Sequence, residues 1–338
     1  MTRLILTTSD SGAGALTQTG IADIVIPFGF RFTSGPLPSD AQLAKSFATR
    51  SPERNPAVPY WLDFLDRRRR GEVGRKGLGL IELCARCERV ELWIDPEPNA
   101  QLMLVQLLDY LQPHGKTALN LTLVQSNVAI GNRLPAAVSK WSRAAAEVTK
   151  NHFESAGTAW RAYREPTPQG WFNLLDEDLG VLPQLGQTVL ELLDELPMDA
   201  TGLGATEMRI LELVSAGDAR PFDVFPGYRK RNKRRVFDYW ELGSLLDGLA
   251  RCPSPAVSGL DEGPFTPAMH DDHDRFARYK ESKLELTPLG EAILARTEDF
   301  SRHNPIHRWW GCTELTNDRL WRWNPESRFT SAFQAPST

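Results

Sequence analysis

The sequence predicts an α/β fold, with a Rossmann-like parallel sheet followed by a helical segment and a winged-helix-like C-terminal domain. Residues 89–125 read as strand, helix and strand in that order, which is a βαβ unit and implies parallel strands. Residues 205–297 read as helix, short helix, helix, hairpin and helix, the order of a winged helix-turn-helix. A chain of 338 residues is long for one core, so two domains are expected.

The first domain is predicted to cover residues 1–133. Its opening strand spans residues 3–8 and runs into a loop of small residues, 9–14, before a short helix that is expected from Ala15. Such a loop can bind an anion, because free backbone N–H groups point outward at a helix N-terminus. The loop has neither the glycine spacing of dinucleotide-binding proteins nor the Lys-Ser/Thr pair of a P-loop, so a tight turn without a ligand is the alternative.

The carboxyl edge of the predicted sheet is the expected ligand site of this domain. Further strands are predicted at residues 23–27, 90–94 and 118–124, with an apolar helix over 99–112. Ligands in open α/β sheets collect where the parallel strands end. We expect a small anionic ligand or a partner at this edge. The residues expected to contact it are Ser9, Asp10, Ser11, Gly12, Gly14, Asp95, Glu97 and Ser126.

A helical segment is predicted to connect the two domains over residues 134–200. Apolar residues recur on one helical stripe between Leu182 and Leu196, and the Gly- and Pro-rich stretch 197–204 marks the expected boundary. The winged-helix-like domain then covers residues 201–338 and ends in an aromatic tail. We expect the tail to pack onto its own domain, and stacking on nucleobases is the alternative.

Within the second domain, two short stretches are expected to pair as a hairpin. They are residues 256–258 and 283–286, and a long polar loop separates them. Thr287 is expected to cap the last helix, with Pro288 in its first turn. The third helix, over 238–250, carries acidic residues and no basic residue, which makes it a poor reader of the DNA major groove and a better surface for protein packing or dimerisation.

A basic run directly precedes this third helix and is the candidate nucleic-acid contact. Residues 229–235 hold six cations in seven positions, where contacts to backbone phosphates would be useful. The alternative is a solvated loop whose charge is balanced by acidic segments elsewhere. The cations are Arg229, Lys230, Arg231, Lys233, Arg234 and Arg235.

The composition of the chain argues against several classes of protein function. The net charge of −4 argues against a chain whose whole surface serves nucleic acid or an anionic membrane, so any such contact must be a local patch. Four scattered cysteines do not make a disulfide framework, and no apolar run is long enough to span a bilayer. We therefore expect a cytoplasmic protein without a membrane partner, and no motif indicates a cofactor.

Histidine and cysteine spacing does not favour a metal site. The cluster 270–274 lies in a predicted loop, and Pro305 interrupts the pair His303 and His307. Cys84 and Cys87 have half-zinc spacing without a partner pair, so buried helix cysteines are expected.

Eight short segments, spread over nearly the whole chain, resemble a bacterial family of uncharacterised proteins, the domain-of-unknown-function family 1835 with its usual C-terminal companion domain. The resemblance implies two domains and supplies no activity. Relatives carry a His-Asp pair after the Trp-containing strand, whereas residues 95–100 here read DPEPNA. The matching segments are residues 9–14 (SDSGAG), 34–37 (SGPL), 91–94 (ELWI), 101–104 (QLML), 159–164 (AWRAYR), 202–207 (GLGATE), 286–290 (LTPLG) and 308–311 (RWWG).

Two function hypotheses follow from the sequence. The first is a regulatory or binding protein, with a small anionic ligand or partner at the α/β domain and contact to nucleic acid or protein through the second domain; a homodimer is compatible with it. The second is an enzyme that acts on a nucleotide or phosphorylated metabolite at the sheet edge. That enzyme would use Asp10, Asp95 and Glu97 as acid/base or metal-binding groups.

Overall fold

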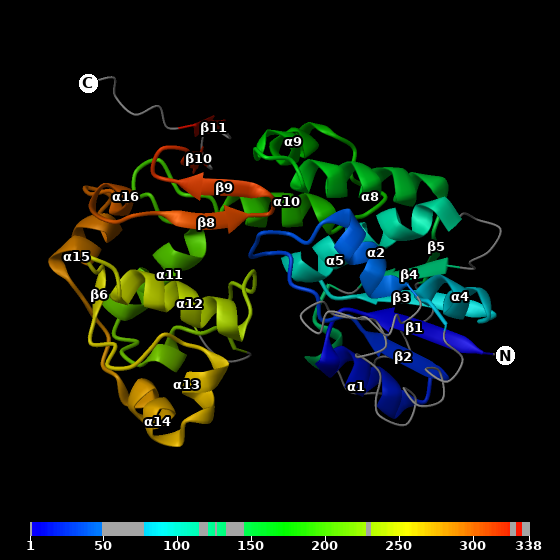
Figure 1. Ribbon diagram of the computed structural model, residues 1–338, viewed down its shortest axis with the longest axis horizontal. Helices are drawn as coiled ribbons and strands as arrows, with labels where there is room; N and C mark the ends of the chain where they lie inside the picture. Colours follow the sequence, from blue (N-terminus) through cyan, green and yellow to red (C-terminus); the bar gives the residue numbers. More distant parts are fainter. Residues whose placement is uncertain are drawn as a thin grey trace. The chain divides into compact units, whose positions relative to one another are not determined.

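A computed structural model describes residues 2–48, 78–114, 121–125, 127–132, 145–227 and 231–324, and the strand 329–332. The chain divides into two compact units (Figure 1). Unit 1 comprises residues 1–32, 37–164 and 173–188, and unit 2 comprises residues 33–36, 165–172 and 189–338. The predicted domain boundaries after residues 133 and 200 stay predictions.

Unit 1 is built on a five-stranded, mostly parallel sheet, which confirms the predicted α/β class. The strand order is β2-β1-β3-β4-β5; the first four strands run parallel, and β5 is antiparallel to β4. Since β2 and β3 flank β1 on opposite sides, the chain reverses its direction of winding between β1 and β3. The strands are β1 (Arg3–Thr7), β2 (Ile24–Pro27), β3 (Arg89–Ile94), β4 (Leu121–Gln125) and β5 (Ala146–Glu147).

Helices cover both faces of this sheet (Figure 1). Ile5 faces α1 (Asp10–Thr19), in a cluster with Ala13 and Leu16. Leu6, its neighbour in β1, points to the other face, because strand side chains alternate; there it meets α5 (Pro98–Leu111). Helix α5 is buried on nearly every side, as its apolar sequence predicts, and α8 (Lys150–Tyr163) packs against it. The other helices and 3-10 turns of this unit are α2 (Asp40–Phe47), α4 (Leu80–Ala85), η2 (Gln112–His114), η3 (Ile130–Asn132) and η5 (Leu174–Asp176).

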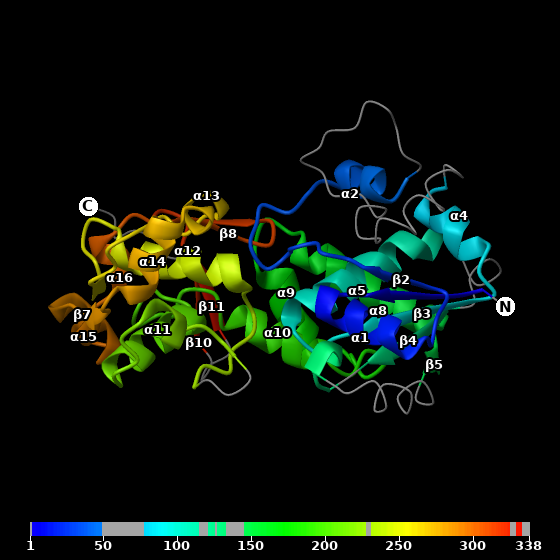
Figure 2. The same cartoon turned by 90° about the horizontal axis from the view of Figure 1, so that it is seen from below.

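Unit 2 has the predicted order of helix, short helix, helix, hairpin and helix. Figure 2 shows the helices α11, α12 and α15 of this order. Val257 pairs with Leu286 and Ser258 with Glu285, so the expected hairpin forms. The elements are α11 (Ala205–Ser215), η6 (Pro221–Asp223), α12 (Tyr239–Ala250), β6 (Val257–Ser258), β7 (Glu285–Leu286) and α15 (Pro288–Leu294).

The prediction of a polar loop between β6 and β7 was wrong, because this segment contains two helices. These are α13 (Pro267–Asp271) and α14 (His273–Glu281). Thr266 and Asp272 cap them by accepting hydrogen bonds from backbone N–H groups of their first turns. Tyr279 of α14 is fully buried among apolar side chains, so tertiary packing stabilises a segment whose composition is polar.

The aromatic tail packs within unit 2, and two of its tryptophans bond to residues of the predicted connecting segment 134–200. The indole N–H of Trp310 donates to the carbonyl of Leu192 at 2.7 Å, and that of Trp323 donates to Asp194 at 2.9 Å. Both acceptors lie at the end of α10 (Leu185–Leu193) or just after it. The other elements are α9 (Gln169–Asn173), α16 (Phe300–His303), β8 (His307–Trp310), β9 (Thr313–Thr316), β10 (Trp321–Asn324) and β11 (Phe329–Ala332). No helix among the described residues is long and apolar enough to cross a bilayer.

Candidate functional site

Ser9 and Asp95, which the sequence assigned to one sheet edge, are in contact in unit 1. The Ser9 hydroxyl donates to Asp95 Oδ2 at 2.7 Å, and the backbone N–H of Ile130 donates to Asp95 Oδ1 at 2.7 Å. The two residues follow β1 and β3, which are neighbours in the sheet. The Asp95 carboxylate therefore ties together the ends of two strands and the turn η3.

The small residues after β1 are helical, which corrects the predicted loop. Helix α1 begins at Asp10 rather than at Ala15, because the Ser9 side chain accepts a hydrogen bond from Gly12 N–H at 3.1 Å and caps the first turn. Turn η3 packs closely on this turn, since a Cβ on Gly131 would lie 2.4 Å from the Ser11 hydroxyl oxygen.

The surroundings of Asp95 oppose the binding of an anion at this edge. Asp95 is only 4% exposed, and burial raises the pKa of its carboxyl, while the hydrogen bonds from Ile130 and Ser9 act against the rise. The carboxylate already accepts hydrogen bonds from the Ser9 hydroxyl and the Ile130 N–H, so these donors are not available to a ligand. When it is ionised, its negative charge would also repel an incoming phosphate. The hydroxyl of Thr7, buried on the same face, has no hydrogen-bond partner among the described residues.

The other residues assigned to this edge differ in exposure. Asp10, Ser11 and Gly14 are exposed on α1, whereas Gly12 is buried. Glu97 is half-buried and stands at the N-cap of α5, without a side-chain hydrogen bond to that helix. Ser126 lies outside the described residues.

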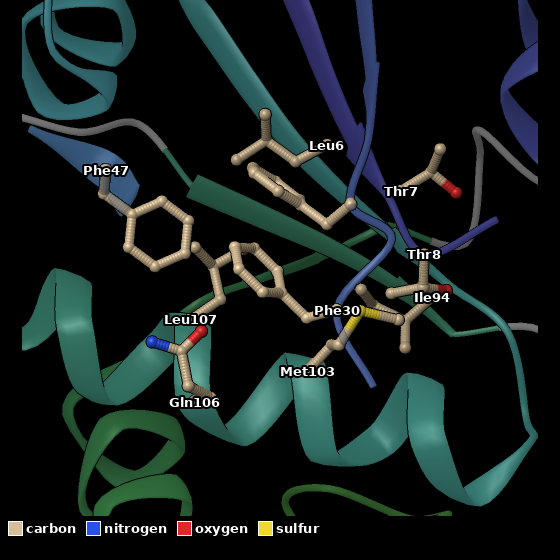
Figure 3. Close-up of a pocket in the computed structure, with 10 residues that line it drawn as sticks. Leu6, Thr7, Thr8, Phe30, Phe47, Ile94, Met103, Gln106 and Leu107 are labelled. Atoms are coloured by element: carbon tan, nitrogen blue, oxygen red, sulfur yellow. The ribbon is translucent and has the colours of Figure 1, made fainter. Parts of the chain in front are cut away.

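A small recess of about 10 Å³, which has room for about one water molecule, opens on the α5 side of the same edge (Figure 3). The ends of β1 and β3 contribute Thr8 and Ile94, and three phenylalanines form an aromatic wall. Sequence reasoning missed this wall; the alternation of phenylalanine after β2 was the one signal for it. The lining residues are Leu6, Thr7, Thr8, Phe28, Phe30, Phe47, Ile94, Met103, Gln106 and Leu107.

The basic run before α12 is partly structural. Arg234 donates to the buried carboxylate of Glu195, which also accepts from the Thr206 hydroxyl at 2.7 Å. Burial raises the pKa of Glu195, and Arg234 acts against that rise. Arg231 forms an ion pair with Asp218 at 3.1 Å. Two of the predicted phosphate-binding cations therefore already have carboxylate partners.

The remaining cations fall into two groups. Lys233 and Arg235 are exposed in unit 2. Arg229 and Lys230 lie outside the described residues.

An exposed aromatic pair follows these cations in sequence. Tyr239 and Trp240, at the start of α12, are each 38% exposed, and no other large hydrophobic side chain of the described residues is. Trp240 rests on Phe265, with ring centroids 5.3 Å apart, and on the ring of His270 at 5.5 Å. The pair was visible in the sequence only as neighbours of the basic run.

No three His, Cys, Asp or Glu side chains gather into a possible metal site within the described parts of the chain. His303 contacts Glu298 and His307 contacts Glu314, so these two histidines have separate carboxylate partners. Cys84 is buried in α4, and burial raises the pKa of its thiol well above the ordinary value.

Comparison with known proteins yields only weak similarity. Neither a protein-family model nor a curated protein matches the chain. The DnaG catalytic core is 14% identical, covering 56% of this chain and 52% of that one, with a TM-score of 0.27. The DNA-binding, cleavage and re-ligation domain of Plasmodium falciparum topoisomerase II is 10% identical, covering 98% and 54%, with a TM-score of 0.41. The chain thus spans about half the length of each, and similarity this low says nothing about its function.

Proposed function

We propose that this protein is a regulatory or binding protein whose unit 2 contacts nucleic acid through a cationic-aromatic face. We define this face as Lys233, Arg235, Tyr239 and Trp240, all of which are exposed. The observation that carries the proposal is the exposed Tyr239–Trp240 pair, because no other large hydrophobic side chain of the described residues is exposed. Aromatic rings beside cations bind nucleic acid by base stacking together with phosphate contact.

The aromatic pair is supported by contacts with other rings, which suits a stacking platform. The ring of Tyr239 stacks on Phe222, with centroids 5.8 Å apart and planes at 4°. It also meets the edge of Trp240 at 5.2 Å. The underlying phenylalanines belong to the core of the unit. A base that stacks here therefore costs little side-chain conformational entropy on binding.

The charges around the face are mixed, and the acids nearest the aromatic pair are engaged in capping. Asp238 accepts from the N–H groups of Trp240 and Glu241, and Glu241 accepts from Asp238 N–H and from the hydroxyl of Ser34, which belongs to the same unit. The adjoining ends of α13 and α14 carry further acids. They are Asp271, Asp272 and Asp274.

Single-stranded nucleic acid fits this face better than duplex DNA. Helix α12 presents Glu241 and Asp247 and no basic residue before Arg251, so it is poorly suited to the major groove. The order of α11, η6, α12, the β6–β7 hairpin and α15 supports the winged-helix-like interpretation, which is part of the proposal, as is the Rossmann-like character of unit 1. Membership of the domain-of-unknown-function family 1835 is likewise our proposal and rests on the short sequence matches.

Fluorescence anisotropy with a labelled single-stranded oligonucleotide, over a series of salt concentrations, tests the proposal. We expect affinity to fall with salt, and the variant Lys233→Ala/Arg235→Ala to reduce the log–log slope by about 1.4, or about 0.7 for each phosphate that the variant no longer neutralises. Lys45→Ala/Arg86→Ala is the matched control, because it removes two exposed cations from unit 1.

Three outcomes would contradict the proposal. They are the absence of binding at low salt, an equal effect of the two double variants, and unchanged binding after Tyr239→Ser/Trp240→Ser. If a protein partner is captured instead and is lost with the last variant, the face serves protein contact.

A further inference from the structure

The ring surface of the cationic-aromatic face continues beyond Trp240 onto His270, which lies near the end of α13. The centroid of the His270 ring is 5.5 Å from that of Trp240 and 4.3 Å from that of Phe276 on α14. The side chain of His270 keeps 38% of its surface exposed. The imidazole is therefore packed against other rings of the face and is still accessible to a ligand.

His270 can add a positive charge to the face. Histidine is the side chain that ordinarily changes its charge between about pH 5 and pH 8. On its own helix, the Oδ1 atom of Asp271 lies 3.5 Å from His270 Nδ1. The side chain of Asp271 is 82% exposed, and an ion pair in water contributes little, so this carboxylate competes only weakly with another anion.

The helices packed against His270 bring charges of both signs near it. From α12, the ring of Tyr239 lies 6.3 Å from the imidazole. From α14, Lys280 Nζ lies 4.8 Å from the centroid of the Phe276 ring, so the contacts from Trp240 through His270 and Phe276 end at a cation. The other charged or titratable groups at the adjoining ends of these helices are Asp238, Glu241, Asp272, His273, Asp274 and Arg275.

We propose that His270 contacts a phosphate at the proposed nucleic-acid site, so that single-stranded nucleic acid binds more tightly as the pH falls. The inference rests on the proposed function, because it requires a base that stacks on Trp240. Such a base brings the phosphates on either side of its sugar close to the neighbouring imidazole. The imidazolium would donate a charge-assisted hydrogen bond to one of them, whereas the neutral ring adds no charge to the face.

Fluorescence anisotropy of the full chain with labelled oligothymidylate, at about pH 5.5 and about pH 8, tests this inference. Thymine does not titrate over this range, so a change in affinity belongs to the protein. We expect the wild type to bind about three- to fivefold more tightly at the lower pH, as for one exposed ionic contact. The slope of log affinity against log salt should also be steeper there by about 0.7.

Two single variants separate His270 from other groups that titrate over the same range. His270→Phe keeps a ring against Trp240 and Phe276 but cannot be protonated. It should therefore bind as the wild type does at the higher pH and lose the gain at the lower pH. His303→Phe is the matched control, because the side chain of His303 is 37% exposed and also has a carboxylate partner, Glu298 at 3.0 Å. It should keep the gain.

The outcomes distinguish this inference from the proposed function. If the wild type binds no oligothymidylate at either pH, both fail. If Tyr239→Ser/Trp240→Ser abolishes binding while His270→Phe keeps the pH dependence of the wild type, the proposed function stands and the inference is overturned. An equal loss of the gain in His303→Phe would also overturn it.

NMR of the imidazole nitrogens measures the reciprocal effect without a variant. If protonation of His270 strengthens binding, then bound oligothymidylate must move the titration midpoint of His270 to higher pH. The midpoint of His303 should stay where it is. A His270 midpoint that does not move on binding would overturn the inference, because a residue that only packs against Trp240 has no such linkage.

Discussion

Arg234 and Arg235 are neighbours in the sequence but have opposite surroundings in unit 2. Arg234 neutralises the buried carboxylate of Glu195, whereas Arg235 is exposed. Arg234→Ala would leave that carboxylate buried without its cation, so we expect a loss of about 3 kcal/mol or more in the free energy of unfolding. Arg235→Ala should change it by no more than about 0.5 kcal/mol. Urea unfolding followed by tryptophan fluorescence measures both.

This difference decides how the basic run should be tested. A variant that includes Arg234 would lose nucleic-acid binding by unfolding the unit, and so could not report on phosphate contact. If Arg234→Ala and Arg235→Ala proved equally stable, the ion pair with Glu195 would contribute nothing and the run would be a solvated loop.

Asp95 is expected to make the stability of unit 1 depend on pH. Burial raises its pKa in the folded state above the ordinary value of about 3.9. Its favourable contribution is therefore fully present below the ordinary value and is lost as the pH rises through the raised one. Compared with Asp95→Asn, the wild type should lose stability progressively as the pH increases from about 4 through the raised pKa of Asp95.

Hydrogen exchange of the peptides around β3 measures this difference within unit 1. The hydrogen bonds that asparagine alters at Ser9 and Ile130 add a constant offset, so the slope with pH is the informative quantity. A stability difference between the two proteins that stays constant over the pH range would contradict the expected burial of the ionised carboxyl.

At the scale of elements, two glycines of α12 form a matched pair. A Cβ on Gly243 would lie 2.1 Å from a ring carbon of Phe265, whereas one on Gly248 would meet nothing within 4 Å. Gly248→Ala should stabilise the unit by about 0.5–1 kcal/mol through helix propensity, and Gly243→Ala should destabilise it by about 1–3 kcal/mol through overpacking. Thermal unfolding measured by calorimetry distinguishes the two.

The same pair links packing to the proposed function. Phe265 supports the rings of both Tyr239 and Trp240. Gly243→Ala should displace Phe265 and thereby weaken nucleic-acid binding. This loss is expected even though the cations Lys233 and Arg235 are unchanged. Gly248→Ala should bind as the wild type does. Equal affinities for the two variants would show that the aromatic platform does not need Phe265.

The strands and helices that are predictable from the sequence are those with a local signal. Strand β3 and helix α5 are rich in apolar residues and have a Pro-containing turn between them, which is sufficient to predict a βαβ unit. Helix α14 has a polar sequence, and only packing of Tyr279 into the core reveals why it forms. The recess was equally hidden, because Phe30, Phe47 and Gln106 come from distant segments that tertiary structure brings together.

The candidate site shows the same division between local and non-local information. The approach of Ser9 to Asp95 follows from parallel strand order, since the carboxyl ends of neighbouring strands meet at one edge. The ion pairs of Arg231 and Arg234 could not be predicted, because their carboxylate partners lie elsewhere in the sequence. A run of cations in the sequence therefore predicts a local positive charge, but it does not predict which of these cations are available to bind a ligand.

At the scale of the whole molecule, the hydrogen bonds of unit 2 predict which fragment of the chain folds. Three side chains of this unit donate hydrogen bonds to residues that precede residue 201. The pairs are Arg234 with Glu195, Trp310 with the Leu192 carbonyl, and Trp323 with Asp194. A fragment of residues 201–338 would leave the indole N–H groups and the guanidinium without their acceptors, each a cost of about 1–3 kcal/mol. A fragment of residues 165–338 keeps all three.

We therefore expect residues 165–338 to unfold in one cooperative thermal transition, and residues 201–338 to lack one, when both are followed by circular dichroism. Neither fragment contains Ser34, so the hydrogen bond from Ser34 to Glu241 does not distinguish them. A cooperative transition of residues 201–338 at the same temperature would mean that α10 is dispensable for unit 2. In that case the boundary predicted from the Gly- and Pro-rich stretch at 197–204 would be the physical one, and the tail would owe its order to packing within residues 201–338 alone.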